Sequence, residues 1–253
     1  MKINKYIFIS ISFVFCSVVY PQKQEKILFV GNSFTFYYNI PSTVEQMALA
    51  KGLKWKVYQS TAGGASLKDH WLGNKNLNTH KMLKRKRFSK VVFQDYSSNP
   101  LTAIDSTVKY LHLLQKKLRN KPTQYLYATW AYPGIAGQSK DTLLQSLSIE
   151  EALSQNTSRG ESVVKVGRAF DVFRMRFPEI ELLSDDAKHT NPNGSYLAAC
   201  VFFAQLSGQS AMGLPRRKEG KDENGKKIYY YIVQANVAEK CQAVADEIVF
   251  SPN

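Results

Sequence analysis

Cysteine and histidine are scarce in this chain, and with them the usual ligands of transition metals. The 253 residues include 3 cysteines and 4 histidines, and the histidines stand far apart. None has the Cys/His spacing of a zinc or iron site, so the sequence predicts no metal centre and no cofactor. Cys200 and Cys241 fall in helix-like apolar segments, where they either pair in an oxidising compartment or remain buried free thiols.

Long apolar runs are also lacking. The longest extends from Tyr6 to Tyr20, about 15 residues, which is short for a membrane-spanning helix. Lys2 and Lys5 precede it and polar residues follow it, as is typical of a secretory signal peptide. We therefore expect a signal at 1–22, cleaved near its end, and an exported periplasmic or extracellular protein without a membrane span. The alternative is an uncleaved N-terminal anchor.

Acidic side chains are few relative to basic ones. The chain has 20 acidic and 34 basic residues, a formal charge of +14, and much of the excess lies in two runs, 81–90 and 216–221. Such runs attract nucleic acid or, more simply, form solvated helix ends. Aromatic residues do not alternate with the basic ones as stacking platforms would, so the sequence predicts no nucleic-acid partner and leaves attraction to an acidic polysaccharide open.

What the chain does have is an alternation of short apolar segments and amphipathic ones, in a length suited to a single domain at 23–253. This alternation predicts an α/β fold: a three-layer α/β/α sandwich around a flavodoxin-like, parallel, five-stranded sheet. The expected strands are 26–30, 54–58, 90–93, 124–128 and 163–166. The expected helices are 41–51, 103–119, 140–156, 168–177, 194–206 and 235–250. The Asn224-Gly225 pair predicts a hairpin turn before a further strand at 228–233.

A serine follows the first expected strand directly. The apolar residues 27–30 lead into Gly31-Asn32-Ser33, which places the Ser33 hydroxyl at the carboxyl edge of the sheet. A serine nucleophile needs a base and a group that orients the base. Asp186 precedes His189 by three residues in a later loop, and Asp185 could take the place of Asp186 in a shifted register. Each pattern alone is weak, but their order along the chain favours a catalytic triad of Ser33, His189 and Asp186.

Groups that could hold an oxyanion follow the next two strands. A Gly63-Gly64 pair lies after the second strand, where a glycine allows close approach of a backbone N–H. Gln94 follows the third strand and carries a side-chain amide that can donate. Together with the backbone of Ser33, a glycine of this pair and Gln94 form the expected oxyanion hole, and it is the family resemblance given below that selects Gly64 over Gly63.

These segments, in this order, resemble the SGNH (GDSL-type) hydrolases, over nearly the whole chain from 27 to about 208. The likeness is greatest to the DUF4886-like subgroup of exported bacterial proteins. It is carried by ILFVGNSFTF, GGASLKDHW, VVFQDYS, Thr129-Trp130-Ala131 and DDAKHTNPNGSYLAA. Two departures from the family pattern stand out: Gln94 occupies the position of an asparagine, and Thr61 lies where the glycine block has a leading asparagine.

The resemblance implies a serine esterase that hydrolyses esters by acyl transfer, and with export it suggests deacetylation of a carbohydrate. The alternatives are a lipase or thioesterase of the same fold, or a catalytically silent carbohydrate-binding relative. The expected partner is a small-molecule or polysaccharide ester, with Asn32, Tyr96 and Trp130 as expected substrate contacts. His70, near the same edge, is expected either to pack in the core or to support the residues that contact substrate, and it is not expected to be the base. The oligomeric state is not predicted.

Overall fold

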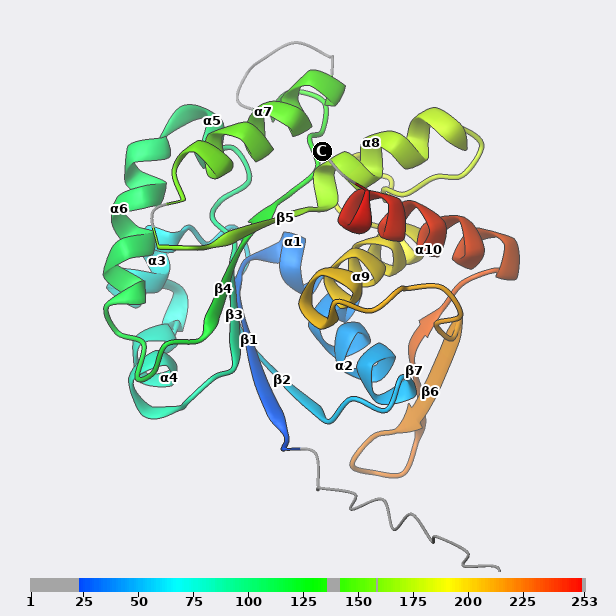
Figure 1. Cartoon of the computed structure of the whole chain (residues 1–253), viewed down its shortest axis with the longest axis horizontal. Coiled ribbons are helices and arrows are strands. Elements are labelled where there is room, and N and C mark those ends of the chain that lie inside the picture. Colours follow the sequence, from blue (N-terminus) through cyan, green and yellow to red (C-terminus); the bar gives the residue numbers. More distant parts are fainter. Residues whose placement is uncertain (1–22, 136–141, 158, 252–253) are drawn as a thin grey trace, which may run out of the picture.

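The computed structural model describes residues 23–135, 142–157 and 159–251, and the expected signal peptide at 1–22 lies outside them. Five parallel strands form the central sheet in the order β2-β1-β3-β4-β5 (Figure 1). This is the strand order of flavodoxin-like sheets, and the α/β prediction is confirmed. The strands are β1 (Glu25–Gly31), β2 (Trp55–Thr61), β3 (Lys90–Phe93), β4 (Thr123–Ala128) and β5 (Ser162–Lys165).

The sheet is buried on both faces because side chains alternate along each strand. In β1, Ile27 and Phe29 pack into one hydrophobic cluster, whereas Leu28 and Val30 pack into a second cluster on the opposite face. All four side chains are fully buried. A continuous apolar run in the sequence therefore corresponds to a central strand covered by helices on both sides.

The helices form two layers (Figure 1). One layer contains α3 (Leu67–Leu72), α4 (Thr79–Arg85), α5 (Asn99–Thr102), α6 (Ile104–Gln115) and α7 (Thr142–Gln155). The other contains α1 (Ser33–Phe36), α2 (Ile40–Ala50), α8 (Val166–Arg176), α9 (Pro192–Ser207) and α10 (Ala235–Phe250). Short 3₁₀ turns are η1 (Tyr37–Asn39) and η2 (Asn74–Asn76). Helix α9 contacts α2, α8 and α10, which is why it is apolar on almost every side.

A small antiparallel hairpin, β6 (Arg217–Lys221) and β7 (Lys227–Ile232), stands apart from the main sheet (Figure 1). Its turn contains Gly225 with φ +77°, as the Asn-Gly pair predicts. The main differences from the sequence prediction are the short helices α1, α3, α4 and α5. These are too short to give a periodic hydrophobic signal.

Both cysteines outside the expected signal are buried free thiols, Cys200 in α9 and Cys241 in α10. Burial raises the pKa of each thiol well above its usual value, so neither is a ready nucleophile. Within the described part of the chain, no helix is both long and apolar enough to cross a membrane. The same residues contain no group of three or more His, Cys, Asp or Glu side chains arranged for a metal ion.

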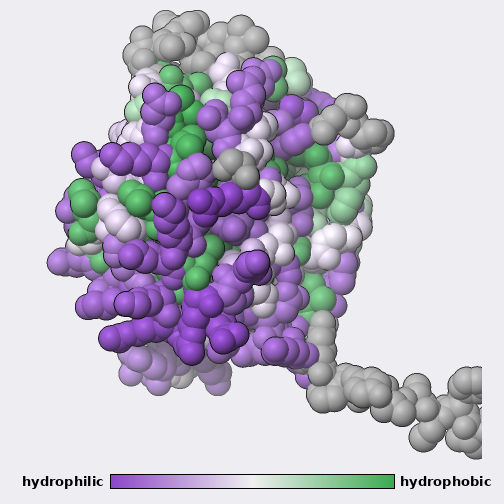
Figure 2. Space-filling view, turned by 60° about the vertical axis from the view of Figure 1, so that its left-hand side comes forward, coloured by the Kyte–Doolittle hydropathy of each residue, from purple (hydrophilic) through white to green (hydrophobic). Residues whose placement is uncertain are grey.

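The first basic run begins on α4 and continues into the loop before β3. His80, Lys81, Lys84, Arg85 and Arg119 surround an open hollow there. The lower part of Figure 2 shows the hydrophilic surface that these side chains and their neighbours form. Because α4 ends where β3 begins, this basic surface lies toward the amino edge of the sheet, away from the carboxyl edge that carries Ser33.

Candidate active site

The turn after β1 presents Ser33 at the carboxyl edge of the sheet. Asn32 caps α1, and its Oδ1 accepts the Phe34 N–H at 3.1 Å. The Asn32 Nδ2 donates to the carbonyls of Ala65 (2.9 Å) and Asp95 (3.2 Å). Asn32 thus joins the ends of three segments, and it also lines the pocket above Ser33. Its side-chain hydrogen bonds build the turn, and the contact of Asn32 with substrate stays a prediction.

Gln94 lies beneath this turn and is 1% exposed. Its Oε1 accepts from the Asn32 N–H (2.9 Å) and the Thr35 hydroxyl (3.0 Å), and its Nε2 donates to the Asp95 carbonyl. A Cβ on Gly31 would come within 2.5 Å of Gln94 Oε1, so only glycine fits there. The Gln94 amide does not line the pocket above Ser33, which corrects the prediction that it donates to an oxyanion.

Ser33, His189 and Asp186 form a continuous hydrogen-bonded chain. His189 Nε2 lies 2.9 Å from Ser33 Oγ, and His189 Nδ1 lies 2.5 Å from Asp186 Oδ2. A carboxylate can only accept, so Nδ1 carries the proton and Nε2 is free to accept the serine proton. This is the arrangement that activates a serine nucleophile. The structure brings together the three residues that the sequence predicts as a triad.

The loop between α8 and α9 holds Asp186 against His189 in two ways. Besides the side-chain contact, Asp186 Oδ1 accepts the backbone N–H groups of Lys188 (3.0 Å) and His189 (2.9 Å). These bonds, led by the one from the His189 ring, lower the pKa of Asp186 to about 2. Asp186 is therefore ionised at neutral pH. The Tyr37 ring stacks on the His189 imidazole with 4.1 Å between centroids, which limits its rotation.

A second histidine contacts the turn of residues 31–33 from the core side. His70, in α3, is fully buried, and its Nε2 lies 3.0 Å from the Gly31 carbonyl. Its Nδ1 lies 2.7 Å from the Thr79 hydroxyl, which in turn contacts the hydroxyl of Ser60 at 2.8 Å. Burial lowers the pKa of His70 to about 4, so the ring is neutral at physiological pH. His70 is more than a packing residue, because it hydrogen-bonds the backbone two residues before Ser33.

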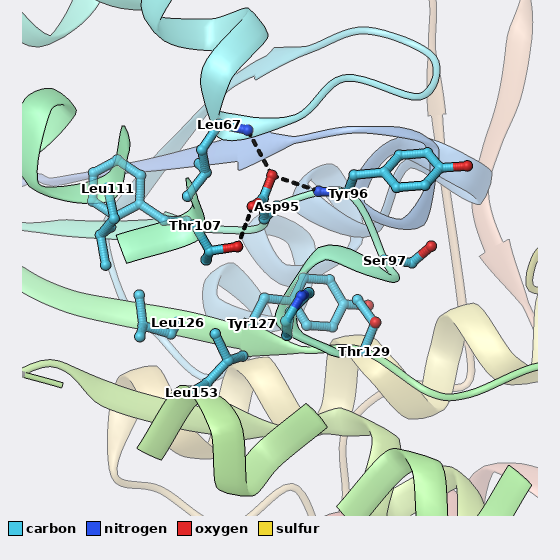
Figure 3. A pocket seen from close by; sticks show the side chains of 12 residues that line it. Leu67, Asp95, Tyr96, Ser97, Thr107, Leu111, Leu126, Tyr127, Thr129 and Leu153 are labelled. Carbon is cyan, nitrogen blue, oxygen red and sulfur yellow. Dashed lines mark hydrogen bonds between the residues drawn. The ribbon is translucent and has the colours of Figure 1, made fainter. Parts of the chain in front are cut away.

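A buried carboxylate fixes the segment that follows β3. Asp95 is 7% exposed and accepts the backbone N–H groups of Leu67 (2.7 Å) and Tyr96 (2.8 Å) and the Thr107 hydroxyl (2.5 Å). Figure 3 shows these bonds converging on Asp95, with the Tyr96 ring directed away from them. Asp95 thereby ties the start of α3, a turn of α6 and the segment of Tyr96 together beside the catalytic edge.

A pocket of about 410 Å³ opens above Ser33. Gly64 lies on its wall with φ +59°, in the 62–65 turn closed by the Ala65 N–H and the Ala62 carbonyl (3.1 Å). Tyr96, which the sequence predicts to contact substrate, also lines the pocket. Lys188 lines it as well, and sequence reasoning missed this residue. The only signal that could have pointed to it is its position next to His189.

Trp130 does not reach the pocket surface. Its side chain is fully buried and stacks between Phe34 and Phe170, with ring centroids 4.7 and 4.4 Å away. Its Nε1 donates to the Lys188 carbonyl at 2.9 Å. This corrects the prediction that Trp130 contacts substrate. From the core side, it supports the loop that carries Asp186 and His189.

Comparison of the fold with solved structures gives several similar proteins. A DUF4886 family protein from Bacteroides uniformis has a TM-score of 0.69 and 18% identity, over 90% of this chain and 96% of that one. A protein from Slackia heliotrinireducens described as an SGNH hydrolase has a TM-score of 0.58 and 25% identity, over 73% of this chain and 100% of that one. The psychrotrophic esterase EstA from Pseudoalteromonas has a TM-score of 0.52 and 11% identity, over 73% of this chain and 97% of that one.

By sequence alone, no family model and no curated protein matches the chain. The structural likeness nevertheless agrees with the resemblance seen in the sequence. The chain has the α/β fold of the SGNH hydrolases, with a five-stranded parallel sheet and helices on both faces.

Proposed function

We propose that this protein is a serine esterase that uses Ser33 as its nucleophile. The observation that carries the proposal is the chain of contacts from Ser33 Oγ to His189 Nε2 and from His189 Nδ1 to Asp186. A serine hydroxyl is a weak nucleophile unless a base can take its proton, and here a neutral imidazole is oriented to do so. The similar folds of the esterase EstA and of the protein described as an SGNH hydrolase support the same chemistry.

In the proposed reaction, Ser33 Oγ attacks the ester carbonyl carbon while His189 Nε2 takes the hydroxyl proton. The resulting imidazolium is stabilised by Asp186. The bond to the alcohol oxygen then breaks, and His189 returns the proton to that oxygen, which leaves an acyl-enzyme. A water molecule, deprotonated by His189, attacks the acyl-enzyme and releases the acid and free Ser33.

The oxyanion donors in this proposal are backbone N–H groups. Ser33 is the first residue of α1, so its N–H has no acceptor within the helix. Gly64 supplies the second donor from the opposite wall of the pocket. Gln94 acts indirectly, since its Oε1 holds the Asn32 N–H and so sets the path of the chain into Ser33.

For the substrate we propose an acylated carbohydrate, with acetate as the acyl group, and export from the cytoplasm as the route by which the enzyme meets it. The expected signal peptide and the sequence resemblance support this assignment. A pocket of this size holds one sugar unit and a short acyl chain more readily than a long fatty acyl chain.

The direct test is hydrolysis of p-nitrophenyl acetate and p-nitrophenyl butyrate by the chain from residue 23 onward. The Ser33→Ala variant should lose at least about 10³-fold in kcat. Ser154→Ala, which makes the same substitution on an exposed part of α7, is the matched control and should keep full activity. Equal rates for Ser33→Ala and wild type would refute the esterase assignment. A preference for butyrate over acetate would instead favour a lipase.

A further inference from the structure

Lys188 places a positive charge in the wall of the active-site pocket without taking part in the acyl-transfer steps. Its ammonium nitrogen lies 4.9 Å from the centre of the Tyr132 ring and 5.9 Å from that of Tyr96. Both distances fall within the range of cation–π contacts, which hold an ammonium group without neutralising it. The charge is therefore held at the pocket rather than spread over a freely moving side chain.

The backbone of Lys188 is fixed on both sides. Its N–H donates to Asp186 Oδ1 at 3.0 Å, and its carbonyl accepts from Trp130 Nε1 at 2.9 Å. The preceding Ala187 has φ +52°, a left-handed conformation that turns the chain sharply before Lys188. Because His189 comes next, the same bonds that orient its imidazole also fix the position of the Lys188 Cα, from which the lysine side chain extends.

Among the described residues, no side-chain carboxylate forms an ion pair with the Lys188 ammonium group. Among the described residues that line the pocket there is no Asp or Glu. The closest acid along the chain that bears on the site, Asp186, is engaged by the His189 ring. Because Asp186 contacts the backbone N–H of Lys188, the Lys188 ammonium group is left to pair with a substrate anion that enters the pocket.

We propose that Lys188 binds a carboxylate of the substrate, so that the enzyme selects esters whose alcohol part is an acid, such as an acylated sugar acid. This inference rests on the proposed esterase function and narrows its substrate class. An ammonium–carboxylate contact inside a partly enclosed pocket is less screened than one on an open surface. The aromatic rings of Tyr96 and Tyr132 beside the ammonium restrict the water around it further.

The test uses two esters that differ in charge at one position, 3-acetoxybenzoate and methyl 3-acetoxybenzoate, with release of the phenol followed by absorbance. The measured quantity is the ratio of kcat/KM for the anionic ester to kcat/KM for the neutral ester. In wild type this ratio should exceed one and should fall as salt is added. Lys188→Met should lower the ratio roughly fivefold to tenfold, and Lys188→Arg should retain most of it.

Lys54→Met is the matched control, because it removes the same charge from an exposed position just before β2. It should leave both the activity and the ratio unchanged. An unchanged ratio in Lys188→Met, or an equal drop in Lys54→Met, would overturn the inference. The esterase proposal fails separately: it falls if wild type and Ser33→Ala hydrolyse the neutral ester at the same rate, whatever the charge preference.

Discussion

Two histidines contact the turn of residues 31–33. Comparing them shows which one could act on a substrate and which one supports the turn. His189 approaches Ser33 from the pocket, with its side chain 17% exposed, and its partner on the far side is a carboxylate. His70 approaches Gly31 from the core, is fully buried, and has the Thr79 hydroxyl on its far side. One ring can exchange a proton with substrate and solvent, and the other cannot.

The hydrogen-bond partners also determine how each ring is protonated. The Gly31 carbonyl only accepts, so His70 Nε2 carries the proton and Nδ1 accepts from the Thr79 hydroxyl. In His189 the proton lies on the opposite nitrogen, because Asp186 faces Nδ1. The same side chain thus donates to the backbone in one place and accepts from a serine in the other. A histidine beside a nucleophile is a general base only when its outward nitrogen is the unprotonated one.

Replacing His189 should reduce activity more than any other change considered. His189→Gln removes the base but keeps a polar group of similar reach, so kcat for p-nitrophenyl acetate should fall by about 10⁴-fold. The melting temperature should change little, because the imidazole lies at the edge of the core, where its contact with Phe34 has ring centroids 5.7 Å apart. A comparable loss of activity in His70→Gln would contradict the assignment of His189 as the base.

Asp186→Asn should have the next largest effect, a fall in kcat of about 10³-fold, because the amide can donate to His189 Nδ1 and so favour the wrong tautomer. The carboxylate has a pKa of about 2 and is ionised at all higher pH. The loss should therefore be similar at about pH 6 and about pH 8. Rates measured at both values check this, and a loss confined to one of them would point to another orienting group, such as Asp185.

His70→Leu tests the support role and should lower kcat about tenfold with little change in KM. The leucine leaves the Gly31 carbonyl without its donor, which should also cost about 1–3 kcal/mol in unfolding free energy. His70→Gln places an N–H₂ group near the position of Nε2. Its kcat and its unfolding free energy should therefore be closer to the wild-type values than those of His70→Leu. Denaturant unfolding and steady-state kinetics should be measured on both variants. Together they distinguish the loss of a hydrogen bond to Gly31 from the loss of a general base. Equal damage in both variants would contradict positioning through Gly31.

Protonation of His70 should have the smallest effect on activity. Its effect on the free energy of unfolding should nevertheless be measurable. The ring titrates near pH 4 in the folded chain and near 6.5 when its burial is lost. Between these values the unfolded chain binds a proton that the folded chain does not, so stability falls as the pH falls. The loss should approach about 3 kcal/mol at pH 4. Urea unfolding at several pH values should show this slope in wild type and a shallower one in His70→Gln.

The fold and the triad could be predicted because each depends on order along the chain. Apolar runs that alternate with helical patterns fix a parallel sheet, and parallel strands bring their carboxyl ends to one edge. Ser33 and the Asp186–His189 pair then meet without further information. The short helix α3, which carries His70, has no hydrophobic period of its own, so the contact with Gly31 could not be foreseen.

The misassigned residues share a different cause, since their roles depend on which way a side chain points after a strand has ended. Gln94 follows β3 immediately, and its direction is set by the space that Gly31 leaves empty. Trp130 lies two residues beyond β4, where the alternation of faces no longer applies, and it turns into the core. Lys188 resembles any lysine in a polar loop until the rings of Tyr96 and Tyr132 are placed beside it.

Gly63 and Gly64 leave one side of the pocket open. This affects how large a substrate the proposed esterase can bind. A side chain added at Gly63 would meet no atom within 4 Å, and one at Gly64 would meet only the Tyr96 ring at 3.9 Å. The pocket is thus bordered on that side by bare backbone and open solvent. For the proposed polysaccharide substrate, this open side leaves room for the polymer to extend past Ser33 in that direction.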